Sequence, residues 1–260
     1  MIDFLLSLPT WLGSFVSILF ATGAGITIYF VSYKLISKYQ KEDLKDPTSN
    51  LFRVIGLLVS LMLSLAFAEV IVEIRAIENA IEREAVAISD ASTDLELFAA
   101  GETHKTRALL VDYLQAVIDD DWPELANDRL GRRPSELRNE IFDSVMKLEP
   151  ETAAQKELWS RIVTDIDTIS DYRLIRLDNA LAEPPVYIYV VFFGFLVTMA
   201  CFGSYRPQGP LVVLVSLYTV FVGLVLYMIL ALSDPFQGGF GIDPITFESL
   251  VKSLRADLGD

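Results

Sequence analysis

The sequence has very few of the residues on which most enzyme sites depend. It contains one cysteine, Cys201, and one histidine, His104, among 260 residues. A single cysteine excludes a disulfide framework and a thiolate metal site within the chain, and one histidine leaves little scope for imidazole chemistry. There is also no glycine-rich phosphate-binding loop and no nucleophile-elbow motif. We therefore expect no enzyme activity, no cofactor and no metal site.

Charge is missing too, but only from parts of the chain. Trp11–Tyr33, Val186–Tyr205 and Pro210–Ser233 contain no charged residue, and Val54–Ala68 adds 15 uncharged positions before Glu69. A helix needs about 20 consecutive apolar residues to cross a bilayer. The sequence thus predicts an all-α, multi-pass integral membrane protein with four transmembrane helices in two pairs, held in a lipid bilayer.

The charged residues gather between the two pairs. Residues 76–185 hold 24 of the 35 acidic and 12 of the 21 basic residues, a local charge of −12. This acidic character gives no reason to expect a nucleic-acid partner. We divide the chain into spans 1 and 2 with a basic connecting loop (1–75), an acidic helical extramembrane domain (76–185), spans 3 and 4 (186–233), and a C-terminal tail (234–260).

Three helices are expected in the acidic domain beyond the one that continues from span 2. Apolar residues recur at helical spacing over His104–Asp120, Pro134–Lys147 and Glu151–Ala182. We expect Pro123 to end the first of these helices, because proline cannot continue one. The acidic run Asp119 to Asp121 lacks the spaced ligands and turn glycine of a Ca²⁺ loop, so we expect it to be solvated.

Small residues form a stripe on each of the first two spans. They recur every fourth position, at Gly13, Ser17, Ala21 and Gly25 and at Gly56, Ser60, Ser64 and Ala68. Residues four apart lie on one helix face, and small residues let helices approach closely in lipid. The alternative is that the second stripe lines a narrow water-filled pore, with Phe67 or Phe52 as an apolar constriction. The sequence leaves both interpretations open.

The helix of span 2 continues into the acidic domain as a heptad seam. Its members are Val70, Ile74, Ile77, Ile81, Ile88, Ala91, Leu95 and Phe98. Glu84 takes the remaining seam position, where a carboxylate is costly to bury without a partner. Arg173 and Arg176 are the candidate partners. An ion pair that fixes the helix register is one interpretation; a vestibule that selects ions is the other.

The segment LSDPFQGGFGID follows the fourth span. Pro235 is expected to end the membrane helix, Asp234 to cap a new turn, and the glycines that follow Phe236, including Gly238, to allow tight backbone. We interpret these residues as a membrane-exit motif, with a role in a contact between subunits as the alternative.

These motifs resemble the bestrophin-like domain family of bacterial and plant membrane proteins. The matching residues are Glu84-Ala85, Tyr113, Trp122-Pro123, Arg173, Arg176 and Asp234-Pro235-Phe236 with Gly238. The family is similar to bestrophin anion channels, which carry Asn-Pro-Phe-Gly or Asp-Pro-Phe-Gly after their last span. The resemblance implies a homo-oligomer, a pentamer, with an axial pore lined by span 2. It does not imply Ca²⁺ gating, because QGGFGID offers only Asp243 as an acidic ligand.

We therefore expect a passive ion channel in a bacterial inner membrane that conducts chloride and similar small anions. The charge of −12 instead favours cations if the acidic domain surrounds the pore, because a field of one sign concentrates the opposite charge. A non-conducting membrane scaffold or sensor, whose helical domain binds a partner, is the third possibility. The basic loop 34–53 favours an acidic domain outside the cytosol, whereas the resemblance implies one inside it, and both orientations stay open.

Overall fold

The computed structural model describes residues 9–36, 45–127, 129–181, 186–236 and 241–259. These residues are helical almost throughout and contain no β-strand. By its internal contacts the chain divides into two compact units. Unit 1 comprises Met1–Val72 and Glu183–Gly241, and unit 2 comprises Glu73–Ala182 and Ile242–Asp260.

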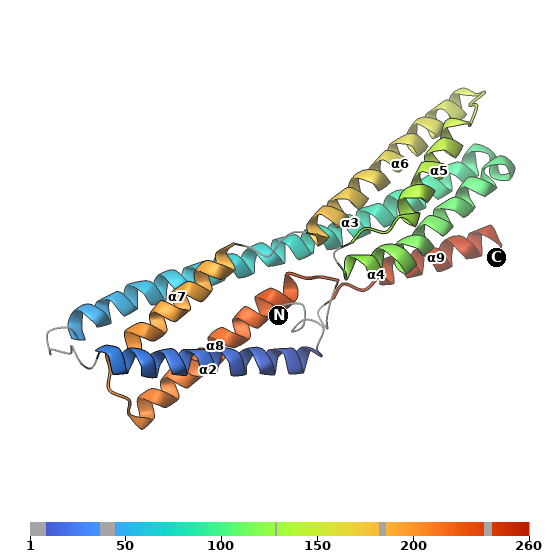
Figure 1. Cartoon of the computed structure of the whole chain (residues 1–260). Helices are drawn as coiled ribbons and strands as arrows, with labels where there is room; N and C mark the ends of the chain where they lie inside the picture. Colours follow the sequence, from blue (N-terminus) through green and yellow to red (C-terminus); the bar gives the residue numbers. More distant parts are fainter. Residues whose placement is uncertain (1–8, 37–44, 128, 182–185, 237–240, 260) are drawn as a thin grey trace. The chain divides into compact units, whose positions relative to one another are not determined.

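Unit 1 consists of apolar helices (Figure 1). They are α2 (Thr10–Ile36), the first part of α3 (Lys45–Ala116), α7 (Tyr187–Phe202) and α8 (Gly209–Leu232). Among the residues that the structure describes, three segments are long and apolar enough to cross a membrane: Thr10–Ile36, Arg53–Ala99 and Gly209–Leu232. The apolar part of α7, Ile188–Phe202, is shorter than such a span. The all-helical class is confirmed, whereas the arrangement of four spans stays a prediction.

Unit 2 is a helical bundle in which α3 turns back on itself. Ala99 has non-helical backbone angles (φ −168°, ψ 88°) and divides α3 into two helical stretches. The buried Thr103 hydroxyl donates to the carbonyls of Leu95 and Ala99, at 2.7 and 2.9 Å, and so ties the turn together. Arg107 reaches Ser92 and Tyr113 reaches Glu84, so the two stretches run antiparallel.

The predicted seam of α3 lies in the core of unit 2. Ile77, Ile81, Ile88, Ala91, Leu95 and Phe98 are all buried, as is Glu84 in their midst. Two further predicted helices agree with α5 (Arg133–Met146) and α6 (Ala153–Ala180) to within two residues at each end. A capping box between Thr152 and Gln155 fixes the start of α6.

One expectation about these helices was wrong. Pro123 does not end the helix that precedes it: a π-helical turn, η2 (Val117–Asp121), leads directly into α4 (Trp122–Leu125). The wider turn accommodates a residue that has no N–H to donate. The expected C-terminal tail contains helix α9 (Ile245–Leu258), which buries Phe247, Val251 and Leu254 in unit 2.

Candidate functional site

The small-residue stripe of α2 is packed inside unit 1. A Cβ on Gly25 would lie 2.5 Å from the Thr219 methyl group of α8. One on Gly223 of α8 would lie 2.7 Å from Ala21, and the Ser17 hydroxyl donates to the Gly223 carbonyl at 3.3 Å. Helices α2 and α8 therefore approach through small residues, the packing that lipid favours.

The matching stripe of α3 is not packed against any of the helices that the structure describes. Ser60, Ser64 and Ala68 are exposed, and a Cβ on Gly56 would meet nothing within 4 Å. The helix instead buries Val59, Ala66 and Val70, and Gly194 of α7 lies directly against Val59. The expected pore-lining residues thus lie on an open face, with Phe67 half-buried beside them.

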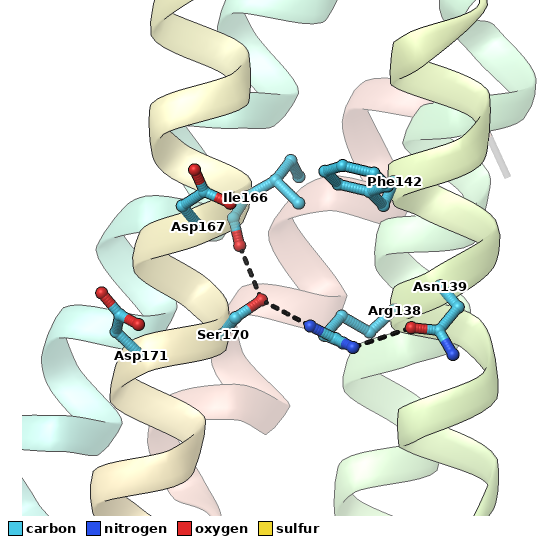
Figure 2. A pocket seen from close by; sticks show the side chains of 7 residues that line it. All are labelled: Arg138, Asn139, Phe142, Ile166, Asp167, Ser170 and Asp171. Atoms are coloured by element: carbon cyan, nitrogen blue, oxygen red, sulfur yellow. Dashed lines mark hydrogen bonds between the residues drawn. The ribbon is translucent and has the colours of Figure 1, made fainter.

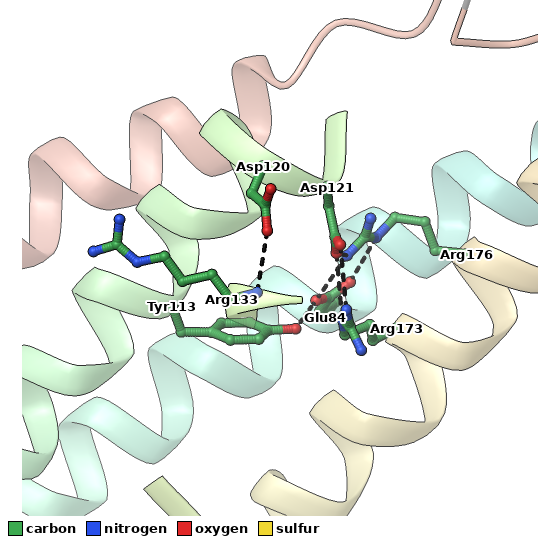
Figure 3. A network of polar contacts seen from close by, with 7 residues as sticks. All are labelled: Glu84, Tyr113, Asp120, Asp121, Arg133, Arg173 and Arg176. Carbon is green, nitrogen blue, oxygen red and sulfur yellow. Dashed lines mark hydrogen bonds and ion pairs between the residues drawn. The ribbon is translucent and has the colours of Figure 1, made fainter. Parts of the chain in front are cut away.

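A buried polar network holds unit 2 together, and it contains Glu84 (Figure 3). Arg176 donates to Glu84 through Nε at 3.0 Å and through Nη2 at 3.4 Å. The Tyr113 hydroxyl donates to the same carboxylate at 2.5 Å. None of these three side chains reaches solvent. The seam carboxylate is therefore held by hydrogen bonds from two other helical segments.

Arg173 contacts a different carboxylate from the one expected. Its Nε and Nη2 donate to Asp121 at 3.3 and 3.2 Å, and Arg176 Nη2 also reaches Asp121 at 3.4 Å. Asp121 is fully buried, so our expectation that the whole acidic run is solvated was wrong. The network joins two carboxylates with two guanidinium groups, and its formal charges cancel.

The π-helical turn helps to place Asp121. Both Val117 and Asp121, the first and last residues of η2, are buried. Gly131 packs against the same turn, where a Cβ would lie 2.6 Å from Asp121 Oδ1 and 2.8 Å from Asp120 Oδ2. Asp120 accepts from the Arg133 backbone N–H at 3.1 Å. Only a residue without a side chain fits this approach of the loop, because a Cβ would displace the carboxylates.

Aromatic rings cover the remaining side of Arg176. Its guanidinium carbon lies 5.5 Å from the Trp122 ring centre and 5.7 Å from that of Phe247, within the range of cation–π attraction. The Trp122 indole donates to the Ile242 carbonyl at 2.9 Å, which ties α9 to the network. The charged group is thus enclosed by carboxylates and rings.

The network shifts the pKa values of two of its members. Burial would lower the pKa of Arg176, but the charge and hydrogen bonds of Glu84 outweigh it and raise that pKa above its ordinary value. Burial, followed by the Glu84 charge, raises the pKa of Tyr113 well above 10. Arg176 therefore stays charged and Tyr113 stays neutral at any physiological pH. Such a buried, charge-balanced network suits the fixing of helix register better than contact with a passing ion.

The expected membrane-exit motif lies in the segment after α8. The helix ends at Leu232, and the Ser233 N–H closes it on the Ile229 carbonyl at 2.9 Å. Pro235 is buried in a turn, with Asp234 and Phe236 half-buried on either side. The chain leaves the helix just before a proline, as the steric restriction on the preceding residue favours. Gly238 lies outside the described residues.

A cavity of about 530 Å³ opens between α5 and α6 in unit 2 (Figure 2). Arg138 crosses it and donates to Ser170 Oγ at 3.1 Å and to Asn139 Oδ1 at 2.7 Å. Asp171 points away from this guanidinium in the picture. No group of three His, Cys, Asp or Glu side chains in the described parts of the chain is placed to hold a metal ion.

The fold is similar to that of solved membrane proteins. A variant of a bacterial bestrophin homologue from Klebsiella pneumoniae matches with a TM-score of 0.70 at 12% identity, over 94% of this chain and 99% of that chain. A second variant matches with a TM-score of 0.63 at 12% identity, over 95% and 99%. A crystal structure described as a membrane protein gives 0.61 at 14% identity, over 95% and 99%.

The sequence comparisons agree with the fold. No curated protein matches the chain. The profile of the Bestrophin-like domain matches residues 18–247. Of the residues on which the resemblance was noted, Glu84, Tyr113, Trp122, Arg173 and Arg176 all meet in the buried network. This apolar-helical chain is a membrane protein, and it belongs to the Bestrophin-like domain family.

Proposed function

We propose that the chain is one subunit of a homo-oligomeric ion channel in a bacterial inner membrane. Its pore is lined by the face of α3 that carries Gly56, Ser60 and Ser64. The observation that supports this most is the open position of that face, which none of the described helices of the same chain covers. The family resemblance implies a pentamer, and four crossings per subunit, with α7 as the third.

The chemistry of α3 differs between its exposed faces. Leu57, Leu61 and Leu65 follow the small stripe one position further on and are at least half exposed. Leucine suits lipid or the apolar flank of a neighbouring subunit. Serine and glycine suit a water-filled path, because hydroxyl oxygens can replace water around an ion and small residues leave room.

Small anions such as chloride are the proposed permeant ions, as the resemblance to bestrophins implies. Conduction is passive, since ion-coupled transport usually needs ionisable groups at membrane depth, and the segment Val54–Ala68 has none.

Two observations favour cations as a second candidate. Residues 76–185 carry a charge of −12, and a single-sign field attracts the opposite charge. The Ser60 hydroxyl donates to the Gly56 carbonyl of its own helix at 2.8 Å, so its outward side is an acceptor in this conformation. An acceptor stabilises a cation and repels an anion.

Ion flux through reconstituted liposomes tests the proposal. The purified protein is compared with Ser60→Leu, Ser64→Leu and a control, Thr27→Leu. Thr27 is exposed on α2 and donates to the Gly23 carbonyl at 2.7 Å, the same arrangement as at Ser60. We expect flux in the wild type and the control and a block in the Ser60 and Ser64 variants.

Separate chloride and potassium gradients identify the permeant ion. Absence of ion flux through a folded, correctly inserted oligomer would contradict the channel proposal and leave a scaffold or sensor as the function. Equal flux in all four proteins would place the pore elsewhere.

A further inference from the structure

Two arginines bracket the apolar stretch of α3, one at each end. Arg53 stands eleven residues before Ser64, and Arg75 stands eleven residues after it. An α-helix has 3.6 residues per turn, so eleven residues make three turns to within about 20°. The helix is continuous between the two arginines, because the non-helical residue of α3, Ala99, lies farther along the chain. Both arginines therefore lie on the same helix face as Ser64, the face that carries the small-residue stripe.

The spacing of the two arginines matches the thickness of a membrane. An α-helix rises 1.5 Å per residue, so Arg53 and Arg75 are about 33 Å apart along α3. The hydrocarbon core of a bilayer is about 30 Å thick. The charged residues between the arginines are Glu69 and Glu73, both half-buried, and they lie about 140° and 180° around the helix from Ser64. The open face thus carries no charge within the span and one positive charge at each end.

Both arginine side chains are exposed. Neither takes part in a salt bridge with another described residue, whereas Arg161 and Arg176 of unit 2 each contact a carboxylate. The contact that Arg75 makes is through its backbone carbonyl, which accepts from the Asn79 amide at 2.8 Å. The positive charges of Arg53 and Arg75 are therefore not neutralised within the described parts of the chain, and they can act on mobile ions.

We propose that Arg53 and Arg75 form a positive ring at each mouth of the pore and make the channel select small anions. This inference rests on the proposed function, because only an oligomer with the stripe facing its axis gathers the arginines into rings. Rings of Arg or Lys side chains select anions in other pores. The carboxylates that follow towards unit 2, Glu78 and Glu82, lie about 5 and 10 Å beyond Arg75 along the helix, and so farther from the span.

The reversal potential of the full-length protein in planar bilayers under a potassium chloride gradient tests this inference. It gives the ratio of chloride to potassium permeability. We expect the wild type to prefer chloride. Arg53→Gln and Arg75→Gln should each lower the ratio about tenfold or more, since a field of one sign raises the local concentration of the opposite ion by about 10–1000-fold.

Two matched controls remove the same charge away from the open face. Arg83 is exposed on α3 but lies about 100° around the helix from Ser64. Arg206 is exposed in the loop between α7 and α8. Arg83→Gln and Arg206→Gln should keep the permeability ratio of the wild type. The melting temperatures of Arg53→Gln and Arg75→Gln should equal that of the wild type, because neither side chain has an ionic partner to lose.

The outcomes separate this inference from the proposed function. Absence of current through the folded wild type would contradict the channel itself, and the inference with it. A channel that conducts but prefers potassium, or that keeps its permeability ratio in Arg53→Gln or Arg75→Gln, would overturn the inference alone. An equal fall of the ratio in the two controls would also overturn it, because total charge rather than position on α3 would then decide selectivity.

Discussion

The stripes on α2 and α3 look alike in sequence and differ in structure. Each has four small residues at four-residue spacing. On α2 the stripe packs against Thr219 and Gly223 of α8, whereas on α3 it contacts no other helix within the described parts of the chain. A small-residue stripe therefore predicts a face where something approaches closely, but it does not tell whether that is a helix of the same chain, another subunit or water.

Unit 2 offers a similar contrast between carboxylates. Glu84 is fully buried and receives hydrogen bonds from Arg176 and Tyr113. Asp165 is only partly buried, and burial and the charges of Asp90 and Asp94 raise its pKa, against the opposing effect of Arg161. The first carboxylate is stabilised by donors of its own unit, whereas the second lies among other carboxylates. Substitutions in both stripes and at both carboxylates should separate effects on packing from effects on function.

The largest effect is expected at Glu84. Glu84→Ala leaves the buried charge of Arg176 without its main partner, and breaking a buried pair in this way costs about 3–5 kcal/mol of unfolding free energy. Arg176→Ala added to Glu84→Ala should lower the unfolding free energy much less than Arg176→Ala does by itself, because the orphaned charge is then gone. Denaturant unfolding of unit 2 measures both. Glu82→Ala, at an exposed position two residues earlier, should be almost neutral. If the losses of unfolding free energy from Glu84→Ala and Arg176→Ala simply added in the double variant, the two side chains would not stabilise each other.

The substitutions Gly25→Leu and Gly56→Leu compare the packing of the two stripes. Gly25→Leu forces a side chain into Thr219, Phe195 and Met199 and should cost about 1–3 kcal/mol, as overpacking usually does. A Cβ on Gly56 would have no described neighbour within 4 Å, so Gly56→Leu should leave the melting temperature almost unchanged. Thermal unfolding in detergent gives the comparison. A larger loss of thermal stability from Gly56→Leu than from Gly25→Leu, measured on the dissociated subunit, would contradict the open position of the α3 stripe.

A smaller substitution at Gly56 should stabilise the protein. Gly56→Ala replaces a helical glycine with a better helix former, at a gain of about 0.5–1 kcal/mol where space is free. Gly223→Ala is the counterpart, because its Cβ would lie 2.7 Å from Ala21 and 3.2 Å from the Ile18 backbone. We expect opposite signs for the two substitutions in the same unfolding assay. Stabilisation by both would show that the α2–α8 contact is looser than described.

The smallest expected effect is a pH dependence at Asp165. Its pKa is raised to about 6 in the folded state, from an ordinary value of 3.8. The folded state therefore binds the proton more tightly than the unfolded one, and this contribution to stability is lost as pH rises from about 4 through 6. Asp165→Asn should remove that part of the pH dependence and leave the rest. If the melting temperature of this variant depended on pH as that of the wild type does, the repulsion of Asp165 by Asp90 and Asp94 would be contradicted.

Much of the fold could be predicted from the sequence, because its signals are long and local. Charge-free segments such as Pro210–Ser233 indicated membrane helices, and the α3 seam gave the buried face of a helix some 30 residues long. The segment 234–260 was expected only as a tail, although the helical spacing of Phe247, Val251 and Leu254 could have predicted α9.

The site was harder to predict, because tertiary contacts decide it. In sequence Asp121 is one of three adjacent acids, and only a π-helical turn and two distant arginines make it a buried partner. Two arginines opposite one seam glutamate could have suggested a second carboxylate. The turn of α3 at Ala99 carries no proline, and nothing in the stripes themselves distinguished the packed one from the open one.

The most direct test of the account is ion flux in liposomes that contain the wild type, Ser60→Leu or Thr27→Leu. We expect flux through the wild type and Thr27→Leu and a block in Ser60→Leu, with all three proteins folded and assembled alike. Unchanged flux through Ser60→Leu, or no flux through any of them, would contradict the claim that the open face of α3 lines a pore.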